Sequence, residues 1–185
     1  MNWEQVNKKG YFVLRPQIDP ALREQALNET FLPYGFNPEL SFHSTILHPY
    51  FATKINYETP ELHKSPKYLS DVAACILSQI ETHKNRLHTT DMLKYVPGKV
   101  DPVGPYKFHY DRFPRLDYMF FVYFSKKSPI VGRELLVGTE TNYDTIQIED
   151  GMCIVMKAND PAILHKVLPL REDNEVVLLT NYVWL

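Results

Sequence analysis

Several common signals are scarce or missing in this 185-residue sequence, and each gap excludes a class of protein. The only cysteines, Cys75 and Cys153, lack CxxC spacing, so the sequence predicts neither a disulfide framework nor a thiolate metal site. No apolar run approaches the ~18 residues of a spanning helix. Residues 1–5 have neither the basic flank nor the apolar stretch of a signal peptide. We therefore expect a cytoplasmic protein that does not enter a membrane.

No excess of one charge is present either. The chain has 20 basic and 22 acidic side chains, a net charge of -2, and a pI near 6.4. This balance argues against a broad nucleic-acid-binding surface. Motifs of the form GxGxxG, GxxxxGK[ST], GxSxG and HExxH are missing, which disfavours nucleotide-binding, α/β-hydrolase and zincin functions. The 44% hydrophobic content suits one folded domain over residues 1–185.

Residues 1–90 predict a helical support and a lid. Residues 11–14 form an apolar run typical of a strand, and Asp19-Pro20 is a cap-plus-proline signal that begins a helix. Residues 31–62 contain several prolines without a clear period, which is typical of a functional loop. Ser65-Pro66 repeats the helix-start signal. An apolar stripe at helical spacing follows it at Leu69, Val72, Ala73, Ile76, Ile80 and Leu87.

Residues 91–185 predict short strands separated by turn residues and no further helix. The strands are expected at 92–96, 106–111, 117–125, 134–137, 145–148, 152–157, 163–170 and 176–184. Turn chemistry lies between them, for example at Pro97-Gly98 and Asp150-Gly151. The pattern predicts a mainly β fold, an antiparallel sandwich or barrel, with the N-terminal helices on one outer face.

A candidate metal site comes from two histidines and one carboxylate. His109 and Asp111 are two residues apart in a strand-like segment, so both side chains would face one way. His165 lies 54 residues after Asp111, on the face of a later strand that we expect to point toward the core. Two histidines and one carboxylate form the ligand set of non-haem Fe(II) oxygenases. The alternative is a core histidine with ordinary partners and a separate surface pair.

From about Met92 onward the sequence resembles the iron(II)/2-oxoglutarate-dependent oxygenase superfamily, especially its prolyl-hydroxylase-like members. The resembling segments are Leu93-Lys94-Tyr95-Val96-Pro97-Gly98, Val131-Gly132-Arg133-Glu134-Leu135, the segment 148–156, and His165-Lys166-Val167-Leu168-Pro169. The resemblance implies a double-stranded β-helix, or jelly-roll, core. It also implies Fe(II) bound by His109, Asp111 and His165, with 2-oxoglutarate as cosubstrate and dioxygen as oxidant.

The same resemblance places Tyr95 and Tyr123 at positions that contact the far carboxylate of 2-oxoglutarate; ordinary aromatic packing is the alternative. The family's usual cation for that carboxylate is replaced by Glu175, which would repel it. Arg133, Lys107 and Arg171 are candidates for a relocated cation, and Arg133 is favoured because a guanidinium binds a carboxylate in a bidentate manner. Two other interpretations stay open: the alignment slips and Arg171 in the turn fulfils the usual role, or the protein uses a different cosubstrate, or none.

The function expected is therefore hydroxylation, or another oxidation, of a C–H bond in a small molecule or a short peptide. Residues 31–62 and 97–107 are the expected substrate lids. Two alternatives stay open: a jelly-roll metal-binding protein that has lost 2-oxoglutarate use, and a cupin-like metalloenzyme with another reaction.

Overall fold

The computed structural model describes most of the second half of the chain and part of the first. Described are residues 3–28, 44–45, 71–72, 75–76, 78–79, 86–95, 107–111, 117–168 and 176–184. The helices are α1 (Trp3–Lys9) and α2 (Pro20–Asn28). The strands are β1 (Tyr11–Leu14), β2 (Ser44–Thr45), β3 (Arg86–Tyr95), β4 (Tyr118–Ser125), β5 (Leu135–Gly138), β6 (Tyr143–Ile146), β7 (Cys153–Lys157), β8 (Leu164–Val167) and β9 (Val176–Trp184).

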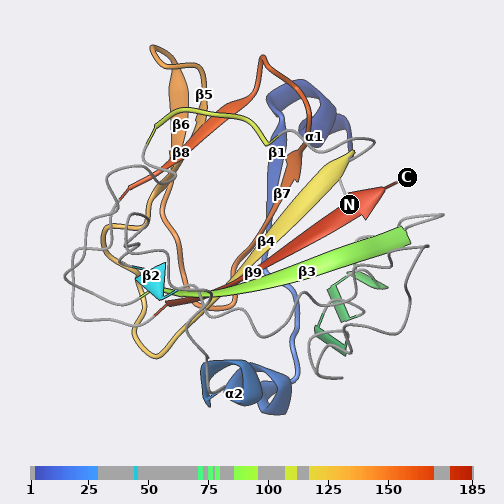
Figure 1. The fold of residues 1–185 in the computed structure, drawn as a ribbon, viewed down its shortest axis with the longest axis vertical. Helices are drawn as coiled ribbons and strands as arrows, with labels where there is room; N and C mark the ends of the chain where they lie inside the picture. Colours follow the sequence, from blue (N-terminus) through green and yellow to red (C-terminus); the bar gives the residue numbers. More distant parts are fainter. Residues whose placement is uncertain are drawn as a thin grey trace.

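The strands form two sheets, as Figure 1 shows. The larger has the order β1-β7-β4-β9-β3-β2 and the smaller the order β6-β5-β8, and every pairing within them is antiparallel. The mainly β architecture predicted from the sequence is confirmed. Among the described residues, no helix has the length and apolar character needed to cross a membrane.

The hydrophobic core lies between the two sheets. Its buried residues on the larger sheet include Met119, Phe121 and Tyr123 of β4, and the smaller sheet adds Leu135 and Val137 of β5. Because successive side chains of a strand alternate between faces, β4 turns a second set of apolar side chains to its other face. That set, Phe120, Val122 and Phe124, is also buried. Strand β4 therefore has both faces covered, which explains its uninterrupted apolar sequence.

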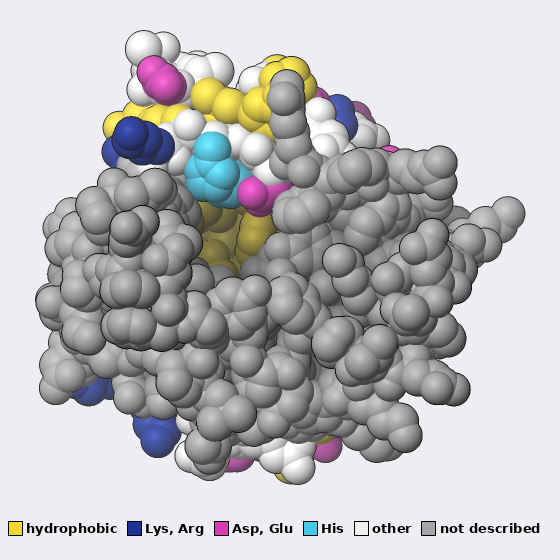
Figure 2. All heavy atoms as spheres, viewed as in Figure 1, with side chains coloured by type: hydrophobic (Ala, Val, Ile, Leu, Met, Phe, Trp, Pro, Cys, Tyr) yellow, Lys and Arg dark blue, Asp and Glu magenta, His cyan; other side chains and the backbone are white. Residues whose placement is uncertain are grey.

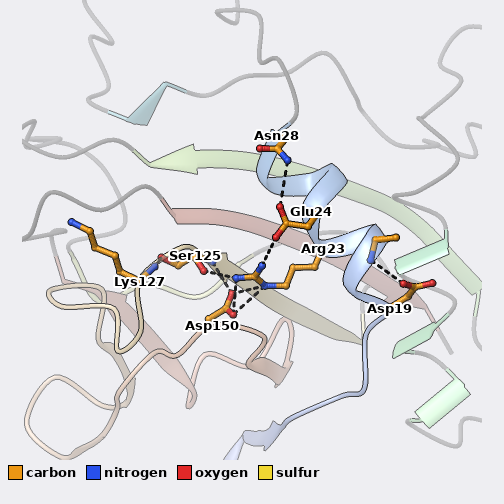
Figure 3. Close-up of polar contacts among 8 residues, drawn as sticks. Asp19, Arg23, Glu24, Asn28, Ser125, Lys127 and Asp150 are labelled. Carbon is orange, nitrogen blue, oxygen red and sulfur yellow. Dashed lines mark hydrogen bonds and ion pairs between the residues drawn. The ribbon is translucent and has the colours of Figure 1, made fainter.

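Helix α2 begins where its cap signal predicts. The Ala21 amide donates to Asp19 Oδ1 at 2.9 Å, and Pro20 occupies the first helical position. The helix contacts β4 and buries Ala26 and Leu27. Its Arg23 binds Asp150 and the Ser125 carbonyl, so α2 is fastened to the end of β4 and to the turn that precedes β7 (Figure 3).

Three predictions differ from the structure by more than a single residue at an element's end. Leu87 was expected in a helix but lies in β3, where Leu87 pairs with Val183 of β9. Residues 106–111 were expected as a strand; the described part, 107–111, forms only an isolated bridge between His109 and His165. Strand β6 lies two residues before its expected position at 145–148. Helix α1 was not predicted.

Other expectations agree with the structure or lie outside the described residues. Strands β1 and β9 have the predicted bounds, and residues 71–72, 75–76 and 78–79 are helical within the predicted second helix. The proposed lid 31–62 lies outside the described residues except for β2, and the lid 97–107 lies outside except for its last residue.

Candidate metal centre

The backbone brings His109 next to His165. Within β8, His165 pairs with Val137 of β5 on one side. On its other side the His109 amide donates to the His165 carbonyl at 3.0 Å, and the His165 amide donates to the His109 carbonyl at 2.7 Å. The smaller sheet therefore continues beyond β8 into the segment 107–111. This reciprocal bridge joins two positions that are far apart in the sequence.

The three predicted ligands converge. Nitrogen and oxygen atoms of His109, Asp111 and His165 all lie within 4.8 Å of one another. Asp111 Oδ2 is 3.5 Å from His165 Nε2, and Asp111 Oδ1 is 3.9 Å from His109 Nε2. The two imidazole rings have centroids 4.2 Å apart. The predicted association of the three side chains is therefore present in the structure.

The separations suit one metal ion. With metal–ligand bonds of ~2.1 Å, adjacent ligands of an octahedral ion are ~3 Å apart and opposite ligands ~4.2 Å. The observed 3.5 and 3.9 Å, which end on the two different oxygens of Asp111, fall between these limits, so small side-chain rotations would bring both imidazoles and the carboxylate into one coordination sphere. Two imidazole nitrogens and one carboxylate oxygen leave the remaining octahedral positions open.

Both imidazoles are arranged to present a lone pair. His109 Nδ1 lies 2.8 Å from the Lys107 carbonyl, which can only accept a hydrogen bond, so Nδ1 is the donor and Nε2, on the side of Asp111, is the nitrogen left to bind a metal. His165 is 5% exposed. Its burial, together with the nearby His109, lowers the pKa of His165 to about 3, so the ring is neutral at pH 7.

The electrostatic environment of the Asp111 carboxylate differs from that of the two imidazoles. Burial raises the pKa of Asp111, while His109 acts in the opposite direction. Burial removes water from a carboxylate and destabilises its charged form, and a bound cation offsets this cost. The environment of Asp111 is therefore one that a metal ion would stabilise.

The ligands border a hollow. In Figure 2 histidine and acidic side chains lie at the edge of a depression whose deeper part shows hydrophobic side chains. The Phe121 ring of β4 lies 6.3 Å from the His165 ring, centroid to centroid, so the apolar core extends to the ligands. Phe121 was not singled out from the sequence; its signal is its place in the alternating apolar pattern of β4.

The structure describes the side chains of some of the predicted cosubstrate residues and not of others. Tyr123 is buried on the core side of β4, two residues beyond Phe121. Arg133 is 1% exposed and precedes β5. Tyr95 ends β3, where it pairs with Val176, and its side chain is outside the described set. Arg171 and Glu175 lie outside the described residues, and the Lys107 side chain is exposed.

Comparison with known proteins finds similarity in structure alone. No family model and no curated protein matches the sequence. A 2OG-Fe(II) oxygenase family oxidoreductase from Burkholderia pseudomallei superposes with a TM-score of 0.60 at 15% identity, covering 98% of this chain and 88% of that one. The chain shares its fold with the 2-oxoglutarate/Fe(II) oxygenases.

Two further structures of this fold have different reactions in their names. The viral collagen prolyl hydroxylase of Paramecium bursaria Chlorella virus-1, in its 2OG complex, gives a TM-score of 0.57 at 16% identity and covers 97% of this chain and 98% of that one. The non-heme alpha-ketoglutarate-dependent epimerase SnoN of nogalamycin biosynthesis gives 0.64 at 12% identity, with 98% and 80% covered. The fold alone therefore leaves the reaction open.

Proposed function

We propose that the chain is a non-haem Fe(II) oxygenase that uses 2-oxoglutarate to hydroxylate, or otherwise oxidise, a C–H bond of a small molecule or a short peptide. The observation that carries this proposal is the convergence of His109, Asp111 and His165 within 4.8 Å in a fold shared with such enzymes. The two sheets would be the major and minor sheets of a double-stranded β-helix, with the N-terminal helices as its support.

Each ligand residue has a defined task in this proposal. His109 would bind through Nε2 because its Nδ1 proton is held by the Lys107 carbonyl. His165 would bind as a neutral imidazole from inside the core, and Asp111 would supply the anionic oxygen. Fe(II) bound there supplies open coordination positions at which a 2-oxo acid and dioxygen react. Phe121 would limit the access of water from the core side.

Arg133 is our candidate for the cation that binds the far carboxylate of 2-oxoglutarate. Arg133 lies two residues before Leu135, the first residue of β5, and is 1% exposed, so its side chain is inside the protein. Val137 pairs with His165, so Arg133 lies four residues before the pairing partner of one proposed ligand, a span of at most ~14 Å of extended chain. A five-carbon dicarboxylate held at one end by the metal, and an extended guanidinium reaching toward it, together cover such a separation.

Tyr123 would act at the same end. The chain leaves β4 after Ser125 and enters β5 at Leu135, so Tyr123 and Arg133 both lie where these two strands are joined. A guanidinium can bind a carboxylate through two parallel charge-assisted hydrogen bonds, and the far carboxylate of a dicarboxylate would be such a group. We propose the same role for Tyr95 from its pairing with Val176, and we place Arg171 second to Arg133 because Arg133 is inside the core.

The test of the function is succinate formation. Protein purified without oxygen would be given Fe(II), 2-oxoglutarate and then dioxygen, and succinate would be measured for the wild type, H109A, D111N and H165A. We expect each ligand variant to lose more than ~100-fold, since even outer-shell changes at metal sites cost 10–100-fold. D144N changes an exposed carboxylate of β6 and should retain activity. Triad-independent succinate, or none while the triad binds Zn(II) tightly, would contradict the proposal.

The role of Arg133 has its own measurement. R133M keeps much of the side-chain volume and removes the charge, and we expect it to weaken 2-oxoglutarate binding at least tenfold while leaving metal affinity within twofold. R15M, which changes an exposed arginine, is the matched control. An unchanged 2-oxoglutarate affinity in R133M would exclude Arg133. Metal binding with no 2-oxoglutarate binding in the wild type would favour the alternative suggested by Glu175, a metal-binding protein without this cosubstrate.

A further inference from the structure

On the outer face of the smaller sheet, Phe108, Tyr143 and Lys166 meet directly behind the metal ligands. Phe108 immediately precedes His109, and Lys166 immediately follows His165. The Phe108 and Tyr143 rings have centroids 5.4 Å apart at a tilt of 43°, and Lys166 Nζ lies 5.7 Å from the Phe108 centroid. None of these three residues belongs to the ligand set, and the proposed reaction does not use them.

The antiparallel bridge explains why Phe108 and Lys166 meet. Because His109 is opposite His165, the preceding Phe108 is opposite the following Lys166. Adjacent residues of an extended chain point to opposite faces, so Phe108 lies outside when His109 points to the ligand cluster. The orientation of the Phe108 side chain is therefore coupled to that of the His109 side chain, because the two residues are adjacent in the chain.

Tyr143 reaches Phe108 across two strands. The order is β6, β5, β8 and then the segment 107–111, so the segment lies ~14 Å from β6 at the usual strand spacing. The rings contact each other only by leaning toward the middle of the sheet. Gly138, opposite Tyr143 on β5, has no side chain to obstruct this. A Cβ atom there would lie 3.2 Å from Tyr143 Cβ and 2.8 Å from its Cα.

The segment that carries two of the three ligands lies outside the regular strands of the two sheets. Its backbone is held by the reciprocal pair of hydrogen bonds between His109 and His165 and by the Asn159 amide, which donates to the Asp111 carbonyl at 3.3 Å. An aromatic pair contributes ~0.5–1.5 kcal/mol beyond its buried area. For a short segment outside the regular strands, such a contact is large enough to select one backbone orientation.

We propose that Phe108 and Tyr143 form a clamp, with Lys166 against it, that holds His109 in position to bind the metal. The proposal rests on the proposed metal site, and its residues act as positioning residues rather than ligands. The Phe108 ring contacts both the Tyr143 ring and the Lys166 ammonium. That arrangement limits rotation of the segment about its own axis, which would turn His109 Nε2 away from Asp111 and His165.

The test is the affinity of the folded apoprotein for Co(II), measured by absorption spectroscopy. We expect Y143A to bind Co(II) about tenfold more weakly and to show altered d–d bands, in line with the 10–100-fold effects of outer-shell changes. Y143F, which keeps the ring, should restore the wild-type affinity and spectrum. T145A, an exposed position on the same face of β6, is the matched control and should match the wild type.

The outcomes separate the clamp from the site. Tight Co(II) binding by the wild type and Y143A alike, with H109A impaired, would overturn the clamp and leave the metal site intact. Failure of the wild type to bind Co(II), or binding that survives in H109A and H165A, would overturn both. Tyr143 is 45% exposed, so Y143A should fold. If it does not, F108L removes the ring pair from the other side, and the same loss of affinity is expected there; an unchanged affinity would again overturn the clamp.

Discussion

Two arginines of the N-terminal region bind neighbouring acidic residues, and their comparison gives a sharp prediction of stability. Arg23 contacts Asp150 through Nε at 3.1 and 3.2 Å and through Nη2 at 2.9 Å, and Nη2 also donates to the Ser125 carbonyl at 2.7 Å (Figure 3). Arg15 binds Glu149 at 2.6 Å. The Arg23 and Asp150 side chains are 27% and 25% exposed, and those of Arg15 and Glu149 are 64% and 40% exposed.

The expected magnitudes follow from this difference in burial. Hydrogen bonds to charged groups contribute ~1.5–3 kcal/mol, whereas exposed ion pairs contribute ~0.2–1 kcal/mol. R23M leaves Asp150 with the Ser125 amide, 2.8 Å away, but without its cation. Allowing for partial hydration of the exposed quarter, we expect a loss of about 2 kcal/mol for R23M and about 0.5 kcal/mol for R15M. For a domain of this size these correspond to about 4–8 °C and 1–2 °C in Tm.

The assay is urea and thermal unfolding followed by circular dichroism, at low and at raised salt. The R15M effect should shrink at raised salt because its ion pair is in water, and the R23M effect should persist because its ion pair is shielded. Methionine retains an apolar stem in both variants, so packing losses are matched. If R23M costs no more than R15M, the partly buried network does not fasten α2 to the end of β4, and this reasoning is refuted.

Two further predictions concern the backbone and one phenol. G10A should destabilise the fold by about 2–4 kcal/mol in urea unfolding, because φ is +81° there and a Cβ would lie 2.7 Å from Ile163 Cδ1. G151A is the comparison: φ is +73° but the space around a Cβ is open, so this variant should lose only about 1 kcal/mol of stability. Tyr11 donates to Asp144 at 2.7 Å, and burial followed by this bond raises the pKa of Tyr11 to about 12. Its stabilisation relative to Y11F should be constant below pH 10 and disappear as pH rises through 12; no such pH dependence of the difference would refute the assigned bond.

The strands of the core were predictable because their buried environment selects particular residue types. Strand β9 keeps its predicted bounds, and β4 and β7 differ from theirs by one residue at the start. All three lie inside the larger sheet, where strands with covered faces select continuous apolar and β-branched residues. The start of α2 was equally legible because a capping carboxylate and a proline act locally.

The start of β3 shows where periodicity fails. Leu87 continues an apolar helical stripe, but the stripe does not report long-range pairing. In the fold, Thr89 and Thr90 pair with Tyr182 and Asn181 of β9, a neighbour that the local sequence does not contain. Two adjacent β-branched residues favour a strand over the end of a helix. The helix prediction gave more weight to the spacing of the apolar residues than to this preference.

The residues that form the candidate site were predictable from the sequence, but the backbone pairing that brings them together was not. The alternation rule placed His109 and Asp111 on one side, but it assumed a strand, whereas the described residues 107–111 form one isolated bridge with His165. The meeting with His165 depends on a pairing across more than fifty residues that alternation cannot reveal. Phe108 and Tyr143 carried no signal of their own, because an aromatic side chain beside a ligand is as common in ordinary packing.

Strand β5 links the parts of the proposed site. Its Val137 pairs with His165, and its Leu135 pairs with Val167, so the strand fixes the position of β8. Two residues before Leu135, the same chain segment carries Arg133 into the core. The distance from the proposed metal ligands to the proposed cation is therefore set by one short stretch of backbone, residues 133–137, and in our proposal an arginine at its start replaces the cation for which the sequence has Glu175.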